Sequence, residues 1–390
     1  MKRSILLIVM FCSHFLFGQT KEFILVDDTT NEPIDLVQIS YPALEIGSIS
    51  NADGRIRIPL KEQNILVSHI NYIEKTFAYN VFKKKDTLFL TPKTNQLDEI
   101  IVYNIDLKAK ITNILKNTYL NQYSTEKSIN KSTYNETFRV NDSLVRFFQV
   151  QLDWWSKEAL FKGNKPIEDQ NKIVLETVDY SKLKKIDSEF VNGASVGNKD
   201  FFKFLHLNFL LSIFKELATD IEIKSVEKDE KSINIHFDAT LIQNGEKMYD
   251  FKNSLMVFDV DYKSINYLKL NMIYDSGLID DVSKKSKIPY QRKTTKNTIE
   301  LSFKKSKNNK LSLNYFIFEI EGIIKNKGFT NTVSSKQSLF ILEHKIGEKI
   351  KKSNIDFEEP FYKNLPSNLK VSDVKILLTN EEKEFLQKNY

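Results

Sequence analysis

The pattern with the clearest catalytic precedent is Gly-x-Ser-x-Gly at Gly193–Gly197, in which Ser195 could act as a nucleophile. A hydrolase of this kind needs its serine on a strained turn between a strand and a helix, with a downstream acid and a histidine. The segment before Gly193 is short and charged, and the surrounding pattern is that of antiparallel strands. We therefore expect a glycine-containing loop here and keep a serine hydrolase using Ser195 as an alternative.

Histidine and cysteine do not add a second catalytic pattern. After residue 20 the histidines are isolated from one another, at His69, His206, His236 and His344. No His-Glu-x-x-His pattern and no acidic cluster with metal-ligand spacing accompanies them. The sole cysteine, Cys12, lies in an apolar leader, so thiol chemistry and disulfides are not expected in the mature chain. The sequence predicts no metal and no cofactor, and we expect a protein that is not an enzyme.

Aromatic side chains offer binding chemistry instead. Trp154 and Trp155 are adjacent in one expected strand, where neighbouring residues point to opposite faces. One of the two indoles must then be exposed or covered by another element. That arrangement suits core packing, and it also suits sugar stacking or a surface for a partner.

The segment 200–220 has the highest apolar density after the leader, but polar residues interrupt it. A helix or helix pair lying against a sheet fits this pattern better than a membrane span. The alternative is a mobile lid over a lipid-like ligand, with Phe204, His206 and Phe209 near that ligand. Together with the two tryptophans, these three residues are the candidates for ligand or partner binding.

The first residues form a separate object. Two basic residues precede an apolar run from Ile5 to Phe17, and the small residue Gly18 follows it. This is the layout of a secretory signal peptide, and the run is shorter than the roughly twenty residues that span a bilayer. We expect residues 1–19 to be removed, so that the mature chain is exported to the periplasm or associates with the outer membrane. An uncleaved anchor is the alternative.

The charge pattern argues against nucleic acid as a partner. Basic residues number 57 and acidic residues 51, and the short lysine clusters at 83–85, 284–287 and 349–352 are not interleaved with aromatic residues. We interpret these clusters as surface charge. No stretch after residue 20 is long and apolar enough to predict a transmembrane helix.

The region 20–95 predicts short strands separated by turns. Ile56, Ile58 and Leu60 alternate with other positions, the period-two pattern of a half-buried strand. The turn before them contains Asn51, Asp53 and Gly54, residue types that tolerate the positive backbone angle of a tight hairpin. Seven short strands in about seventy residues predict a β-sandwich, and we expect the turn to be structural rather than a ligand site.

Residues 96–123 predict a connecting strand and then a helix over about 106–122. Leu107, Ile111, Ile114 and Leu115 fall on one face of that helix. Residues 124–390 return to long strands, and a sheet of that size curls or closes rather than staying flat. We expect a curved antiparallel sheet with a few packed helices.

The N-terminal pattern resembles a known family. The order of "NEPI", "SNADGRIRI", "ILVSHINY" and "LDEIIV" is similar to the carboxypeptidase-regulatory-like domain of Bacteroidetes cell-envelope proteins. The resemblance implies a transthyretin-like sandwich of seven strands that contains none of the catalytic residues of metallocarboxypeptidases.

The second half resembles the C-terminal region of envelope proteins that carry the same sandwich, on the segments "YNETFRVNDSLVRFFQVQLDWW", "FKNSLMVFDVDYKSINYLKL" and "FEEPFYKNLP". That resemblance implies a half-barrel with helices against its concave side, comparable to the shape of lipoprotein carriers.

These observations predict a non-enzymatic envelope protein. The sandwich would serve as a docking or spacer module, and the β-rich region would bind a ligand or an envelope protein partner, with peripheral outer-membrane association. A carrier of an apolar, lipid-like ligand in the concave sheet is the alternative.

Overall fold

The computed structural model describes residues 20–44, 46–93, 105–157, 160–184, 197–283, 286–306, 308–347, 349–366 and 376–388. Its contacts divide the chain into two units. The first contains residues up to 94 together with 374–384, and the second contains 95–373 together with 385–390. Residues 374–384, which the sequence placed in the β-rich region 124–390, therefore belong to the N-terminal unit. The expected leader 1–19 and Ser195 lie outside the described residues.

The first unit is built from short strands. Strand β1 pairs with β4 antiparallel and with β7 parallel, while β2 pairs with β3 and β5, and β5 with β6. Buried side chains from both groups of strands, among them Phe23, Ile39 and Val67, share one apolar cluster. The strands are β1 (Thr20–Asp27), β2 (Gln38–Tyr41), β3 (Ile46–Ile49), β4 (Arg55–Pro59), β5 (Ile65–His69), β6 (Tyr72–Phe77) and β7 (Thr87–Leu90), with the short helix α2 (Tyr79–Phe82).

The turn at Asn51–Gly54 has the geometry that its residue types predict. The Asn51 side-chain oxygen accepts hydrogen bonds from the backbone N–H groups of Asp53 and Arg55, at 3.1 and 3.0 Å. Gly54 has φ +68°, and a Cβ atom there would lie 2.5 Å from the Leu25 carbonyl oxygen. Only glycine satisfies both constraints, because other residues rarely adopt this φ and would collide with β1.

The same turn also holds the C-terminal segment of the first unit. Asn51 Nδ2 donates to the Leu377 carbonyl at 3.1 Å, and the Asn380 N–H donates to Asp53 Oδ2 at 2.7 Å. Asn380 begins helix α8 (Asn380–Gln387), where Thr379 and Glu382 exchange hydrogen bonds as a capping box. The turn therefore joins parts of the chain more than 300 residues apart in sequence.

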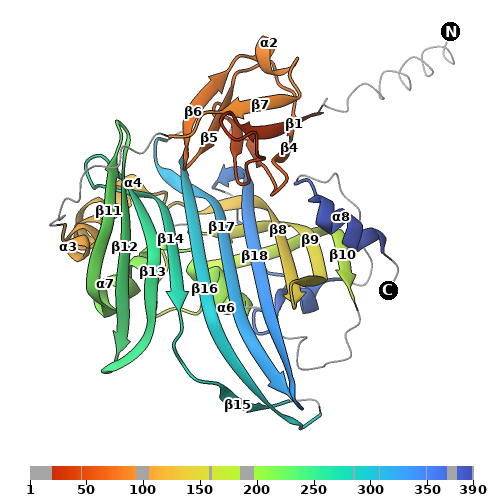
Figure 1. Cartoon of the computed structure of the whole chain (residues 1–390). Coiled ribbons are helices and arrows are strands. Elements are labelled where there is room, and N and C mark those ends of the chain that lie inside the picture. The colour runs from red at the N-terminus through yellow and green to blue at the C-terminus, as the bar shows by residue number, and fades with distance from the viewer. Residues whose placement is uncertain are drawn as a thin grey trace. The chain divides into compact units, whose positions relative to one another are not determined.

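The second unit contains one large, curved antiparallel sheet of the half-barrel kind (Figure 1), as the sequence predicted. Its strands follow the order β11-β12-β13-β14-β16-β17-β18-β8-β9-β10, with the short β15 paired to β16. The last long strand thus returns to pair with the first. The strands are β8 (Ser128–Val140), β9 (Ser143–Ser156), β10 (Asn171–Leu183), β11 (Ala218–Lys228), β12 (Ser232–Gln243), β13 (Glu246–Asp259), β14 (Ile265–Ile273), β15 (Ile279–Val282), β16 (Pro289–Lys305), β17 (Leu311–Asn326) and β18 (Phe329–Ile346).

Alternation along these strands decides which face is covered. Ile235 and Phe237 are fully buried and His236 between them is half-buried, as the period of two predicts. Phe237, Phe316 and Leu339 lie on the buried face, which we call the inner face of the sheet. Helices lie along this face (Figure 1), because Phe214 of α7 contacts Phe237.

The expected helix over 106–122 is present, with a π-helical segment in its middle. It consists of α3 (Leu107–Asn113), the π-helical segment Ile114–Thr118 and α4 (Tyr119–Gln122). The segment 200–220 forms a helix pair, α6 (Asn198–Phe204) and α7 (Leu207–Leu217), before β11 begins. Short helices α5 (Ile167–Gln170) and Phe361–Asn364 complete the unit. No helix among the described residues is long and apolar enough to cross a membrane.

Candidate functional site

The predicted binding residues gather at the junction of α6 and α7, where they are packed rather than open. His206 is fully buried, and its Nε2 lies 3.3 Å from Asn171 Oδ1, which also accepts a hydrogen bond from Trp154 Nε1 at 2.7 Å. The Trp154 and His206 rings are 6.2 Å apart. Indole, amide and imidazole thus satisfy one another inside the core.

Phe204 and Phe209 fill the neighbouring space. The Phe204 ring stacks on Phe318 at 5.8 Å, and Phe209 contacts Phe204 and Phe161 at 6.2 and 5.2 Å. Beside Trp154, the cavity at this junction measures only about 10 Å³, too little for a ligand. Around these described residues the inner face is occupied by the protein's own aromatic rings.

Trp155 is separated from this cluster by the pleat of β9. Its neighbour Trp154 points to the inner face, so Trp155 points to the other one. Both indoles are nonetheless buried, with 1% and 5% of their surface exposed. The structure therefore covers both side chains rather than presenting either one for stacking.

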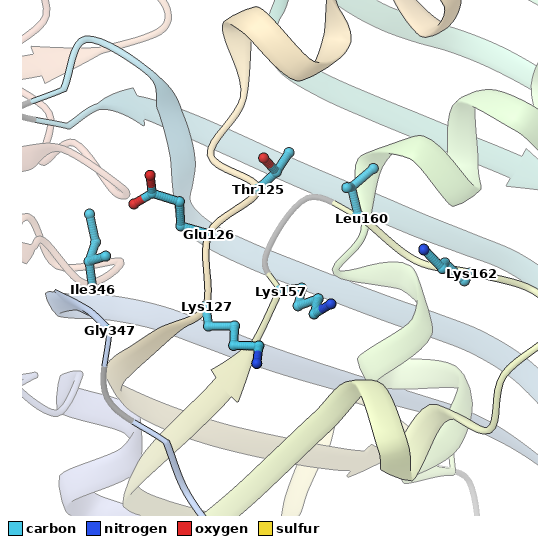
Figure 2. Close-up of a pocket in the computed structure, with 8 residues that line it drawn as sticks. All are labelled: Thr125, Glu126, Lys127, Lys157, Leu160, Lys162, Ile346 and Gly347. Atoms are coloured by element: carbon cyan, nitrogen blue, oxygen red, sulfur yellow. The ribbon is translucent and has the colours of Figure 1, made fainter.

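An open cavity of about 440 Å³ lies instead at one end of the sheet, where β8 begins and β9 and β18 end (Figure 2). The register pairs Ser128 with Ser156 and with Ile346, which brings the residues just beyond them to one place. The lining residues are Thr125, Glu126, Lys127, Lys157, Leu160, Lys162, Ile346 and Gly347. We call this cavity the strand-end pocket.

The segment 160–162 forms one wall of the pocket, and two buried or half-buried amides hold it there. Asn208 of α7 accepts a hydrogen bond from the Phe161 N–H and donates one to the Phe161 carbonyl, both at 2.9 Å. Gln170 does the same for Lys162, accepting from its N–H at 2.6 Å and donating to its carbonyl at 3.0 Å. The polar residue Asn208 in the apolar segment 200–220 therefore has a structural reason: it fixes the pocket wall.

The opposite wall is fixed through the backbone. The Gly347 N–H donates to the Lys127 carbonyl at 2.9 Å. This bond continues the pairing of β18 with β8 by one residue beyond the end of the sheet, so the strand ends hold Lys127 beside Ile346.

The pocket has a basic character. Lys127, Lys157 and Lys162 are exposed, and no ion pair joins any of them to another of the described residues. Figure 2 shows the carboxylate of Glu126 pointing away from the Lys127 ammonium group. Lysine ammonium groups bind carboxylates and phosphates as point charges, and Leu160 adds apolar surface. The arrangement suits an anionic group attached to an apolar one, and it contains no nucleophile.

The strongest charge pair of the unit is not available to a ligand. Arg146 donates to Glu136 Oε1 from Nε at 3.0 Å and from Nη2 at 2.5 Å, and both side chains are buried. The Arg146 guanidinium also lies 4.2 Å from the centre of the Tyr362 ring. Burial raises the pKa of the Glu136 carboxyl, and the charge of Arg146 opposes that rise. This pair is part of the packing of the inner face.

The structure does not assemble a metal site from its described residues. No group of three or more His, Cys, Asp or Glu side chains is placed to hold an ion within the described ranges. His69 lies in the first unit, where burial lowers the pKa of its imidazole to about 4. Ser195 is outside the described residues, so its distance from the histidines is not defined.

Comparison with protein-family models gives no match, and comparison with curated proteins gives none either. Among solved structures, the complex of Pseudomonas aeruginosa MucA/MucB is similar to this chain with a TM-score of 0.19 and 6% sequence identity, covering 63% of this chain and 100% of that chain. A likeness at this TM-score carries no conclusion about fold or function. The pocket is therefore interpreted from its own geometry.

Sequence reasoning missed the strand-end pocket. Its residues come from three segments, 125–127, 157–162 and 346–347, and none of these has a recognisable pattern. The usable signal was indirect: Asn208 and Gln170 are polar residues in buried surroundings, and such residues need partners nearby.

Proposed function

We propose that this chain is an exported, non-enzymatic cell-envelope protein whose β-rich unit binds an acidic segment of a protein partner in the strand-end pocket. In this proposal the N-terminal strands form a transthyretin-like sandwich that acts as a docking or spacer module. The leader-like sequence of residues 1–19 supports export, and the interlocked turn at Asn51–Gly54 supports a rigid mount.

The observation that carries the proposal is the group of three lysines without ion-pair partners among the described residues. They line a cavity of about 440 Å³, a volume typical of binding sites. Hydrogen bonds from Asn208 and Gln170 hold the wall that carries Lys162. Surface lysines are ordinarily mobile, so a wall positioned in this way favours a binding role over general surface charge.

The geometry favours this function over an apolar carrier. A carrier needs an empty hollow of a few hundred cubic ångströms near Phe204 and Phe209. The rings of Phe161 and Phe318 occupy that position among the described residues. The hydrolase alternative has no support in the structure, because Ser195 is not described.

The test measures binding of a fluorescein-labelled acidic peptide, Glu-Leu-Glu-Leu-Glu-Glu, by fluorescence anisotropy. Replacing Lys127, Lys157 and Lys162 together with Gln is expected to weaken binding about tenfold or more, since each charge-assisted contact is worth about 1 kcal/mol or more. The matched control replaces Lys83, Lys84 and Lys85 with Gln, which changes the net charge by the same amount on exposed residues of the first unit.

Equal weakening by both triple variants would show that the peptide responds only to net charge. That result, or the absence of any binding by the unaltered chain, would overturn the proposal. Circular dichroism of each variant checks that the strands remain folded.

A further inference from the structure

Three strands of the second unit run past their neighbours at the end of the sheet opposite the strand-end pocket. Strand β8 ends at Val140, opposite Val333 of β18, and β14 ends at Ile273, opposite Lys296 of β16. Beyond those points β16, β17 and β18 are joined only by the short β15. We call residues 278–283, 289–293 and 323–332 the overhang (Figure 1).

A bulge separates the overhang from the rest of the sheet. The pairing of β16 with β17 shifts by one residue between Thr294 and Lys296. Gly322 lies opposite this shift, and a Cβ atom there would be 2.6 Å from the Lys293 carbonyl oxygen. The missing side chain allows the close approach, and bulges of this kind bend a strand and increase its twist.

Large apolar side chains are exposed along the overhang. Phe329 is 74% exposed, the highest value among the exposed large apolar residues of the described chain, and Ile279 and Val282 are 51% and 52% exposed. Leu278, beside them, is 36% exposed. Monomeric proteins scatter such residues singly, whereas a group of them at one projecting end indicates a contact surface.

These side chains lie on both faces of the overhang. The register aligns Ile279 with Arg292 and Ile324 on the inner face, and Phe329 has the same parity in β18 as the inner-face residue Val333. Val282 is an odd number of residues from Ile279, so it points to the opposite face. A protein partner docked on one face would leave the other exposed, whereas insertion of the end into a fluid apolar phase covers both.

The charges around the overhang are mainly basic. Lys287, Lys325 and Lys327 are exposed and are in no ion pair with other described residues. Asp281 is neutralised by Arg292, whose Nε lies 2.7 Å from Asp281 Oδ2. A surface with apolar tips surrounded by lysines complements anionic lipid headgroups.

We propose that the overhang docks the β-rich unit onto a bilayer that contains anionic phospholipids. The four residues from Phe329 to Val333 extend about 13 Å along the strand, which is enough to pass the headgroups and reach the upper acyl region. Phe329, Ile279 and Val282 enter that region, and the three lysines remain at the phosphates. The proposal rests on the proposed export, because only then does the chain meet this lipid surface.

The experiment is co-sedimentation of the chain from Thr20 onward with vesicles of phosphatidylcholine and phosphatidylglycerol in equal parts, and with phosphatidylcholine alone. The first 19 residues are omitted so that their apolar run does not itself bind lipid. We expect binding to the mixed vesicles that weakens as salt is raised. Phe329→Ser is expected to weaken this binding about tenfold or more, because a buried Phe side chain leaves the lipid.

Two further variants sharpen the result. Lys325→Gln and Lys327→Gln are each expected to weaken binding to the mixed vesicles about fivefold, with no effect on phosphatidylcholine alone. The matched control is Leu120→Ser, which removes an equally apolar side chain that is 59% exposed on α4. All four residues are exposed, and thermal unfolding of each variant checks its fold.

Three results would overturn the proposal. They are the absence of binding to mixed vesicles, equal binding by Phe329→Ser and the unaltered chain, and self-association of the chain that Phe329→Ser abolishes without vesicle binding. The strand-end pocket is measured with the acidic peptide and its own lysine variants, so failure of the pocket proposal and failure of the overhang proposal are distinguishable.

Discussion

The junction of α6 and α7 and the strand-end pocket lie close together in the second unit, yet they differ in what they offer a ligand. At the junction, Trp154, His206 and Phe209 are packed against other side chains of the chain itself. At the pocket, Lys127 and Lys157 face an open cavity. Aromatic density in this sequence therefore marks packing, and the pocket is marked by charges that the fold leaves without ion-pair partners among the described residues.

The largest expected effect concerns the buried charges of the interior. Arg146→Met leaves Glu136 buried without its cation, and we expect a loss of about 3–5 kcal/mol in the free energy of unfolding at pH 7. Urea unfolding followed by tryptophan fluorescence measures this unit alone, because both tryptophans of the chain, Trp154 and Trp155, belong to it.

The pH dependence of this variant has a definite sign. Burial raises the pKa of Glu136 in the folded state, so the folded chain holds a proton that the unfolded chain releases at lower pH. The stability associated with this group is present below the ordinary carboxyl pKa and is lost as pH rises through the raised value. We expect the loss in Arg146→Met to shrink as the pH falls toward the ordinary carboxyl pKa. An equal loss across that range would contradict the assignment, and Glu136→Gln in the same variant is the control.

The second effect tests whether the interior is packed or hollow. Leu211 of α7 is fully buried, and Leu211→Ala is expected to cost about 2–5 kcal/mol through lost burial and a new cavity. Glu216→Ala, on the exposed side of the same helix, should change the stability by less than about 0.5 kcal/mol. A hollow interior would instead tolerate Leu211→Ala as well as the control, and urea titration separates the two results.

The smallest effect on stability concerns the link between the two regions. Asn208→Ala removes the two hydrogen bonds that hold Phe161, at a cost of about 1–2 kcal/mol. Because the freed segment carries Leu160 and Lys162, we expect weaker binding of the acidic peptide even though Asn208 does not line the pocket. Asn117→Ala on α4's neighbouring turn is the control. Stability reduced without any change in peptide affinity would separate the wall from the binding site.

Local patterns in the sequence predicted the elements well. Alternation at Ile235 and Phe237 indicated a strand with one buried face, and the spacing of Leu107 and Ile111 indicated a helix. The polar interruptions in 200–220 indicated helices against a sheet, because His206 and Asn208 would be costly in lipid. These features depend on residues close together in the chain, and a periodic pattern encodes them directly.

Features that depend on distant pairing were not predictable in the same way. The pocket exists because Ser128 pairs with both Ser156 and Ile346, and the overhang exists because β8 and β14 end before their neighbours. The strand expected over 75–81 ends at Phe77 and continues as α2, since the sequence pattern placed strand boundaries only approximately. The reach of the C-terminal segment to Asn51 likewise has no local signal.

The pairing of the last long strand with the first has a consequence for how the second unit folds. Tyr134 of β8 lies opposite Leu339 of β18, a separation of 205 residues (339 − 134). Until β18 has been synthesised, one edge of β8 has no neighbour, and an open edge is a template for pairing with other chains. Non-local contacts of this kind slow folding, so we expect the nascent chain to depend on protection from aggregation until its final strand arrives.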